Sequence, residues 1–143
     1  MTTLALQPAA QGTTKLRISA YWAATTLAAL AFLAGGIADL SRGPALVQGM
    51  AHLGYPAYFM LILGTWKVLG AIAVVAPGFP RLKEWAYAGM AFDLSGAALS
   101  HAAVGDPAAK VVLPLVILGL VAASSALRPA ASGRILRPAS GTR

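Results

Sequence analysis

The chain has 143 residues, of which 58% are hydrophobic and 10% charged, and 11 lysines and arginines against 4 acidic residues give a net charge of +7. A soluble domain carries about 25% charged residues, and a chain this small has too much surface to bury so much apolar material. The composition therefore argues against a soluble globular domain and a disordered chain, and the lack of cysteine excludes disulfides and thiolate chemistry.

Four apolar segments are long enough to cross a bilayer, which takes roughly 20 helical residues. They cover residues 18–40, 57–76, 84–104 and 110–127. The pattern predicts an all-α fold, a four-transmembrane-helix bundle formed as one membrane domain by residues 15–128. Residues 1–14 are expected to form a flexible tail, and residues 129–143 a basic, flexible one.

The connections between these segments contain helix start and stop signals. In residues 41–56, Pro44 can begin a short helix that reaches about Leu53 and ends at Gly54. Its apolar residues suggest a helix that lies on the membrane surface or caps the bundle. Residues 77–83 contain two prolines and a glycine, so they predict a tight hairpin between the second and third spans.

Basic residues are unevenly divided between the two sides that four spans would create. The side with both termini and the 77–83 hairpin holds eight: Lys15, Arg17, Arg81, Lys83, Arg128, Arg134, Arg137 and Arg143. The other side holds only Arg42 and Lys110. Lysine and arginine concentrate in cytoplasmic loops, so we expect both termini in the cytoplasm. We therefore attribute the positive net charge to the orientation of the chain in the membrane, and we predict no nucleic-acid partner.

Two charged residues fall where lipid tolerates charge least. Lys67 lies near the middle of the second span and Asp93 near the middle of the third. An isolated charge there costs roughly 2.5–3.5 kcal/mol or more, and the hairpin makes the two helices antiparallel neighbours at similar depth. We therefore predict a Lys67–Asp93 ion pair, which either fixes the register of the hairpin or forms a proton-handling or ligand-binding site.

Small residues surround both charges on the same helix faces. They are Gly64, Gly70 and Ala71 beside Lys67, and Gly89, Gly96, Ala97 and Ser100 beside Asp93. Small side chains let helix backbones approach closely inside a membrane. Both charges are therefore expected to point into the bundle rather than toward lipid.

Further polar residues are predicted at the two ends of the spans. Asp39, His52 and His101 are expected to form a polar mouth on the outer side. A metal site of two histidines and one aspartate is an alternative there, although no close ligand spacing supports it. At the inner surface, Glu84 and Tyr87 are neighbours at i,i+3. They predict either a site for a polar headgroup or substrate, or an interface anchor.

The stretch LGYPAYFMLILGTWKVLGAIAVVAPGFPRLKEWAYAGMAFDLSGAALSH, residues 53–101, resembles the DoxX-like family of small four-helix bacterial membrane proteins. The most specific parts are Lys67-x-x-Gly70, the run from Pro80 to Gly89, and Asp93 with the Ser-Gly-Ala that follows. The resemblance implies a multi-pass protein of the bacterial cytoplasmic membrane. The wider family is linked to thiosulfate:quinone oxidoreductase subunits and membrane redox complexes, so the resemblance admits a quinone, although it fixes no cofactor.

The leading hypothesis is a membrane protein that binds or converts a lipophilic small molecule in the bundle interior. Lys67 and Asp93 would handle protons, with Glu84 or His101 as a second acid or base. The expected substrate-binding residues are Trp66, Gly70, Trp85, Tyr87, Gly89, Gly96, Ser100 and Asp39, with no resident metal.

The alternative hypothesis is a non-enzymatic subunit or assembly factor whose small-residue faces bind partner helices. The lipid bilayer is the expected partner in both cases. A homo-oligomer or a larger membrane complex is the expected assembly, and a transporter is a third reading that would need an oligomer.

Overall fold

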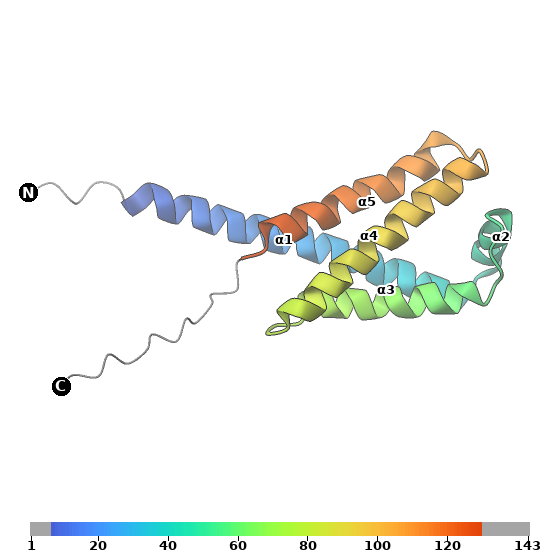
Figure 1. The fold of residues 1–143 in the computed structure, drawn as a ribbon, viewed down its shortest axis with the longest axis horizontal. Helices are drawn as coiled ribbons and strands as arrows, with labels where there is room; N and C mark the ends of the chain where they lie inside the picture. The colour runs from blue at the N-terminus through green and yellow to red at the C-terminus, as the bar shows by residue number, and fades with distance from the viewer. Residues whose placement is uncertain (1–6, 130–143) are drawn as a thin grey trace, which may run out of the picture.

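The computed structural model describes residues 7–129, and it is helical throughout (Figure 1). Its five helices are α1 (Gln7–Ser41), α2 (Pro44–His52), α3 (Phe59–Val75), α4 (Pro80–Ala103) and α5 (Ala108–Leu127). Within that range there is no strand. The predicted all-α class is therefore confirmed.

Two of these helices are long and apolar enough to cross a membrane. They are α1, over Thr14–Ser41, with a mean hydropathy of 1.6, and α5, with a mean hydropathy of 2.1. α3 is apolar but has only 17 residues. α4 is longer, but its mean hydropathy is lowered by four charged residues, Arg81, Lys83, Glu84 and Asp93.

The first helix begins earlier than expected. The predicted flexible tail, residues 1–14, overlaps α1, which starts at Gln7. Pro8 is compatible with a first helical turn because its missing N–H has no intrahelical partner there, and the alanines that follow are the strongest helix formers. Residues 1–6 and nearly all of the predicted tail at 129–143 lie outside the described residues.

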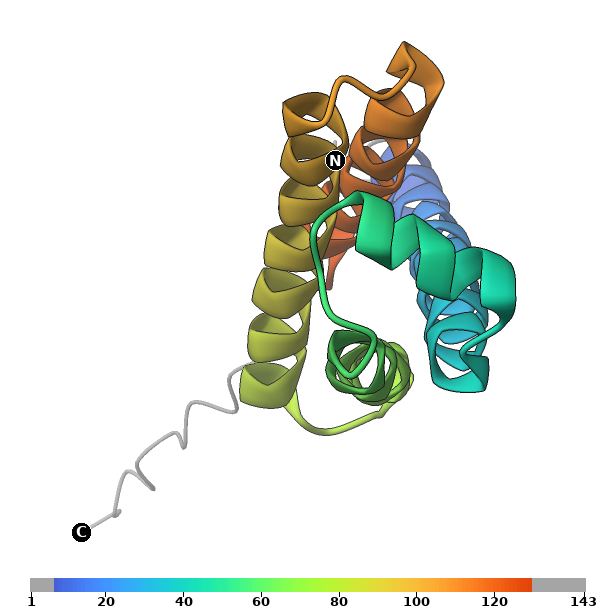
Figure 2. The same ribbon diagram turned by 90° about the vertical axis from the view of Figure 1, so that its right-hand side faces the viewer.

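The short α2 helix confirms the prediction for the first connection. It begins at Pro44 and ends at His52, and Gly54 adopts a φ of +84° that residues other than glycine rarely reach. Figure 2 shows α2 lying crosswise over one end of the long helices. We call this the α2 end and the opposite end, where residues 76–79 join α3 to α4, the hairpin end.

The four long helices pack in a ring that follows their order in the chain, and α5 closes it against α1. α1 lies against α3 and α5, and α4 lies against α5 and α3. α3 and α4 meet at the hairpin end and separate toward the α2 end (Figures 1 and 2). The core between them contains Ala28, Phe32, Ala71, Val74, Tyr87, Met90, Leu94 and Val121.

The backbones of α1 and α3 approach each other closely at Gly36 and Gly64. A Cβ on Gly64 would lie 2.8 Å from the Gly36 carbonyl oxygen. The small residues of α4 do not serve this purpose, because a Cβ built on Gly89 or Gly96 meets no atom within 4 Å. The expectation that the α4 glycines permit close helix packing is therefore wrong within this chain, since both face open space.

A buried polar network ties α1, α4 and α5 together. The hydroxyl groups of Thr25 and Ser124 share a hydrogen bond of 2.6 Å, and the Tyr87 hydroxyl bonds Ser124 at 2.8 Å. Thr25 also donates to the Tyr21 carbonyl at 2.7 Å. Thr25 and Ser124 are fully buried, so their hydroxyls need these partners.

Candidate functional site

Lys67 of α3 lies between two carboxylates from two other helices. Its Nζ donates a hydrogen bond to Asp39 Oδ2 of α1 at 2.9 Å and lies 3.8 Å from Asp93 Oδ2 of α4. The side chains are 22%, 14% and 17% exposed for Lys67, Asp39 and Asp93. We call these three residues the Lys67 triad, and two carboxylates facing one ammonium give it one negative charge when all three are ionised.

Asp39, rather than Asp93, is the closer partner of Lys67. The sequence predicts Asp39 in an outer layer with His52 and His101, but in the structure Asp39 binds Lys67 and both histidines bind Asp106. The crossing of α1 over α3 at Gly64 explains the difference, because Asp39 Cβ lies 3.1 Å from where a Gly64 Cβ would be. One further turn along α3 brings Lys67 to the carboxylate.

Asp93 differs from Asp39 because it is paired with Lys67 without a hydrogen bond. No hydrogen bond from any described residue reaches its carboxylate, and its contact with Lys67 at 3.8 Å is an ion pair without hydrogen-bond geometry. A carboxylate accepts several hydrogen bonds when ionised. Asp93 therefore keeps acceptor capacity for a bound molecule or for water.

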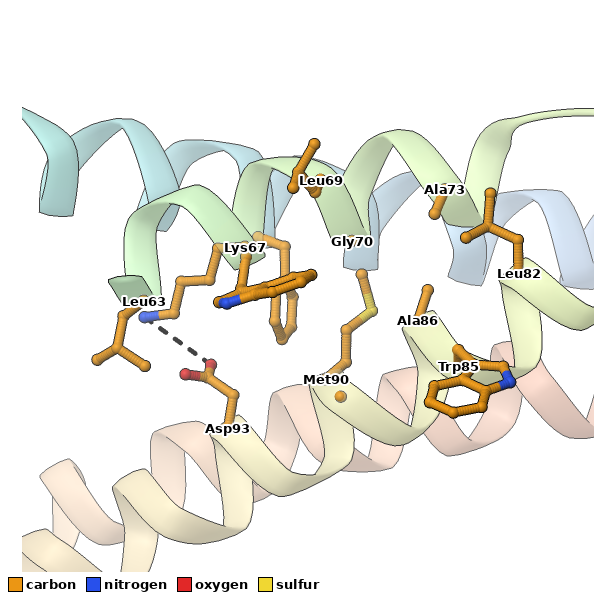
Figure 3. Close-up of a pocket in the computed structure, with 13 residues that line it drawn as sticks. Leu63, Lys67, Leu69, Gly70, Ala73, Leu82, Trp85, Ala86, Met90 and Asp93 are labelled. Atoms are coloured by element: carbon orange, nitrogen blue, oxygen red, sulfur yellow. Dashed lines mark ion pairs between the residues drawn. The ribbon is translucent and has the colours of Figure 1, made fainter. Parts of the chain in front are cut away.

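A cleft of about 410 Å³ opens between α3 and α4 on one side of the triad (Figure 3). We call it the α3–α4 cleft. Lys67 and Asp93 are its charged lining residues, and the rest are Phe32, Leu63, Trp66, Leu69, Gly70, Ala73, Leu82, Trp85, Ala86, Gly89 and Met90. Figure 3 shows Met90 extending toward Gly70 in the middle of the cleft, with the charged pair at one end and Trp85 near the other.

A second cleft, of about 330 Å³, opens on the other side of the triad. We call it the central cleft, because α1, α3, α4 and α5 all contribute to it. Its polar lining residues are Lys67, Asp93, His101 and Lys110, and the apolar ones include Ala31, Ala97 and Leu113. Lys67, Asp93 and Phe32 line both clefts, and the two clefts differ in character.

His52 and His101 both bind Asp106, in the turn between α4 and α5. His101 Nδ1 donates to Oδ2 at 2.7 Å, His52 Nε2 to Oδ1 at 3.3 Å, and Lys110 Nζ to Oδ1 at 3.1 Å. The His101 hydrogen bond does most to lower the pKa of Asp106 from 3.8 to about 2, against the opposing effect of burial, and Lys110 and His52 lower it further. We call these four residues the Asp106 cluster.

The predicted polar mouth therefore has Asp106 where the sequence placed Asp39. The described residues contain no group of three histidine, aspartate or glutamate side chains arranged to hold a metal ion. The cluster instead joins α2 to the α4–α5 turn. A second bond at this end, 2.9 Å between the hydroxyls of Tyr55 and Ser100, fastens the same loop to α4.

Glu84 and Tyr87 do not form one site. Glu84 is exposed and accepts a hydrogen bond from Arg128 at 2.8 Å, whereas Tyr87 is buried and bonds Ser124. Their i,i+3 spacing puts both against α5, but the tyrosine points into the core and the glutamate stays outside. Gly96 and Ser100 line neither cleft.

Comparison with known proteins agrees with the membrane character of the sequence. The sequence profile of the DoxX-like family matches residues 23–124. The chain belongs to the DoxX-like family. Members of this family are generally membrane proteins. A 48-residue stretch is 40% identical to the uncharacterized protein YdgD of Bacillus subtilis, and covers 34% of this chain and 42% of that protein. No solved structure matches the chain significantly.

In this DoxX-like protein, sequence reasoning missed Asp106, Thr25 and Ser124. Gly105 and Pro107 on either side of Asp106 predict a turn, although an acidic residue between two apolar segments is itself a signal of a polar site. Thr25 and Ser124 have no such signal, because threonine and serine are common in apolar helices. Only the packing of α1 against α5 shows that they meet.

Proposed function

We propose that the protein spans a bacterial inner membrane four times, through α1, α3, α4 and α5, with both termini in the cytoplasm. Large apolar side chains are exposed along all four helices, as lipid contact requires. Arg17, Lys83 and Arg128 gather at the hairpin end, while Arg42 and Lys110 are at the α2 end. The hairpin end is then cytoplasmic, and α2 lies on the outer surface.

The proposed function is the binding of a lipophilic small molecule with a polar head in the α3–α4 cleft. The observation that carries it is the position of the Lys67 triad at one end of an otherwise apolar cleft. A volume of about 410 Å³ is within the range of ligand pockets. The many apolar lining residues suit a ring or chain, while the charged end suits a carbonyl or hydroxyl.

The triad can orient such a head and exchange protons with it. The Lys67 ammonium has three N–H donors, of which one is used on Asp39, so another can donate to a ligand oxygen. The free acceptor capacity of Asp93 suits a ligand hydroxyl. A quinone fits both requirements in its oxidised and reduced forms, and its ring could lie against Trp66 or Trp85. Quinone-linked proton transfer is the chemistry that this proposal favours.

Tryptophan fluorescence provides the test, because two of the three tryptophans line the cleft. Trp22→Phe leaves only Trp66 and Trp85 as reporters, and the matched Trp66→Phe/Trp85→Phe double variant leaves only Trp22. In nanodiscs titrated with a short-chain ubiquinone, we expect saturable quenching in the first and only linear, partition-type quenching in the second. Equal quenching in both variants would contradict the proposal.

A non-enzymatic subunit is the alternative function, and one observation favours it. On α4, Trp85, Phe92 and Leu99 are 81%, 77% and 71% exposed at a seven-residue spacing, with Gly89 and Gly96 between them. This alternation of large and small residues suits contact with a partner helix. Purification from native membranes distinguishes the two functions, since a stable hetero-complex that contains no small molecule supports the subunit.

A further inference from the structure

The central cleft contains polar groups at both of its ends. Lys67 and Asp93 lie at the inner end, and His101 and Lys110 lie toward the α2 end. Asp93 and His101 are on the same helix, so their eight-residue separation corresponds to about 12 Å along the axis. The cleft thus reaches from the Asp106 cluster at the α2 end to the triad.

The backbone of α5 adds a further polar group beside this cleft. Pro114 lies inside the helix and cannot donate a hydrogen bond to the carbonyl of Lys110, four residues earlier. Both residues line the central cleft. Inside a membrane, water or a neighbouring group must satisfy a carbonyl that a proline leaves without its helical partner.

These observations together favour water over a lipophilic occupant. A cavity holds water when it is roomy and offers several polar partners, and the central cleft has about 330 Å³, four titratable side chains and a proline-freed carbonyl. Ionisable groups within a membrane are expected to face a water-filled cavity. The α3–α4 cleft has only the two charged residues that it shares with the central cleft.

We propose that the central cleft is a hydrated vestibule, open at the α2 end, through which water and protons reach Asp93. The ligand of the α3–α4 cleft would then meet the triad from one side, and water would meet it from the other. The delivery of protons to a ligand rests on the proposed function, whereas the hydration of the cleft does not depend on any ligand.

The chain's lack of cysteine makes the vestibule directly testable. Single cysteines would be introduced by Ala97→Cys and Ala31→Cys, which line the central cleft from α4 and α1. Leu99→Cys is the matched control, because it lies two residues from Ala97 on the outward, lipid-facing side of α4. The full chain would be reconstituted in oriented vesicles and treated with a cationic, membrane-impermeant methanethiosulfonate from either side.

We expect Ala97→Cys and Ala31→Cys to react from the α2 side at least about tenfold faster than Leu99→Cys, since thiolate forms only in water. Reaction no faster than Leu99→Cys, or reaction only from the hairpin side, would overturn the proposal. Two cleft positions on different helices keep the test decisive if one variant fails to fold. Labelling of the cleft cysteines without saturable quinone quenching would support the hydrated vestibule and contradict the proposed function.

Discussion

Gly36 of α1 and Gly64 of α3 face each other so closely that neither position has room for a methyl group. A Cβ on Gly36 would lie 2.9 Å from the Gly64 carbonyl oxygen, and one on Gly64 would lie 2.8 Å from the Gly36 carbonyl oxygen. Both contacts are with backbone, which cannot move aside as the end of a side chain can. This crossing also sets the distance between Asp39 and Lys67.

Gly36→Ala and Gly64→Ala should therefore each destabilise the protein. Forcing extra carbon into a packed contact costs about 1–3 kcal/mol, which exceeds the gain of up to about 1 kcal/mol in helix propensity. Gly35→Ala is the control, because its Cβ would meet only Lys67 Cδ at 3.9 Å, and it should be neutral or stabilising. Thermal unfolding in nanodiscs, followed by circular dichroism, measures the difference, and equal effects at positions 35 and 36 would contradict it.

Replacement of Lys67 by methionine should destabilise the protein by leaving two carboxylates without their cation. Loss of one partner from a buried pair costs about 3–5 kcal/mol, and the partial exposure of this triad should reduce that cost. Adding Asp39→Leu to Lys67→Met should restore more stability than adding Asp93→Leu, because Asp39 is the hydrogen-bonded partner of Lys67. Better rescue by Asp93→Leu than by Asp39→Leu in unfolding experiments would contradict this order.

Removal of the central hydroxyl of the buried network should cost more than removal of a peripheral one. Ser124→Ala takes hydrogen bonds from both Thr25 and Tyr87, whereas Tyr87→Phe leaves the Thr25–Ser124 bond in place. A buried polar group left without a partner costs about 1–3 kcal/mol. We expect Ser124→Ala to lower the unfolding temperature more than Tyr87→Phe, and the reverse order would contradict the network.

Acid should weaken the Asp106 cluster over a defined pH range. The folded-state pKa of Asp106, about 2, lies below the ordinary 3.8. Its contribution to stability is therefore fully present above pH 3.8 and is lost as the pH falls toward 2. The difference in unfolding temperature between the native chain and Asp106→Asn should be present at pH 4.5 and shrink as the pH falls below 3.8. A difference unchanged at pH 2.5 would contradict this assignment.

Filling the α3–α4 cleft should block its ligand. A Cβ on Gly89 meets no atom within 4 Å, and Gly89 lines the cleft, so Gly89→Leu should fold and occupy the space. Gly96→Leu is the matched control, in equally open space on the same helix but lining neither cleft. We expect Gly89→Leu to weaken saturable quinone quenching by at least about tenfold and Gly96→Leu to leave it within twofold.

Local signals in the sequence were enough to predict the helices. Pro44 and Gly54 marked the ends of α2, and the apolar segments marked the long helices to within a few residues, except where alanines extended α1. The unfavourable energy of a charge in lipid was enough to single out Lys67 and Asp93. Each of these inferences depends either on residues close together in the chain or on the lipid surroundings that the apolar composition indicates. Both can be read from the sequence.

The choice of partners could not be predicted in the same way. The short hairpin suggested that α3 pairs mainly with α4, so Asp93 was assigned to Lys67, but α1 crosses α3 at Gly64 and supplies Asp39. Gly36 and Gly89 look alike in the sequence, and only the helix opposite decides that one is a packing contact and the other lines a cleft. Which neighbouring helix approaches a segment most closely is a global property, and no single segment encodes it.

The pairing of α1 with α3 has a consequence for biosynthesis. Asp39 is translated before Lys67, and Asp93 after it. If the four long helices insert in chain order, as the proposed topology requires, the lysine of α3 meets a counterion on α1 before the rest of the ring exists. Asp93 arrives at an ammonium that is already neutralised, so its carboxylate is free for another use from the moment the chain is complete.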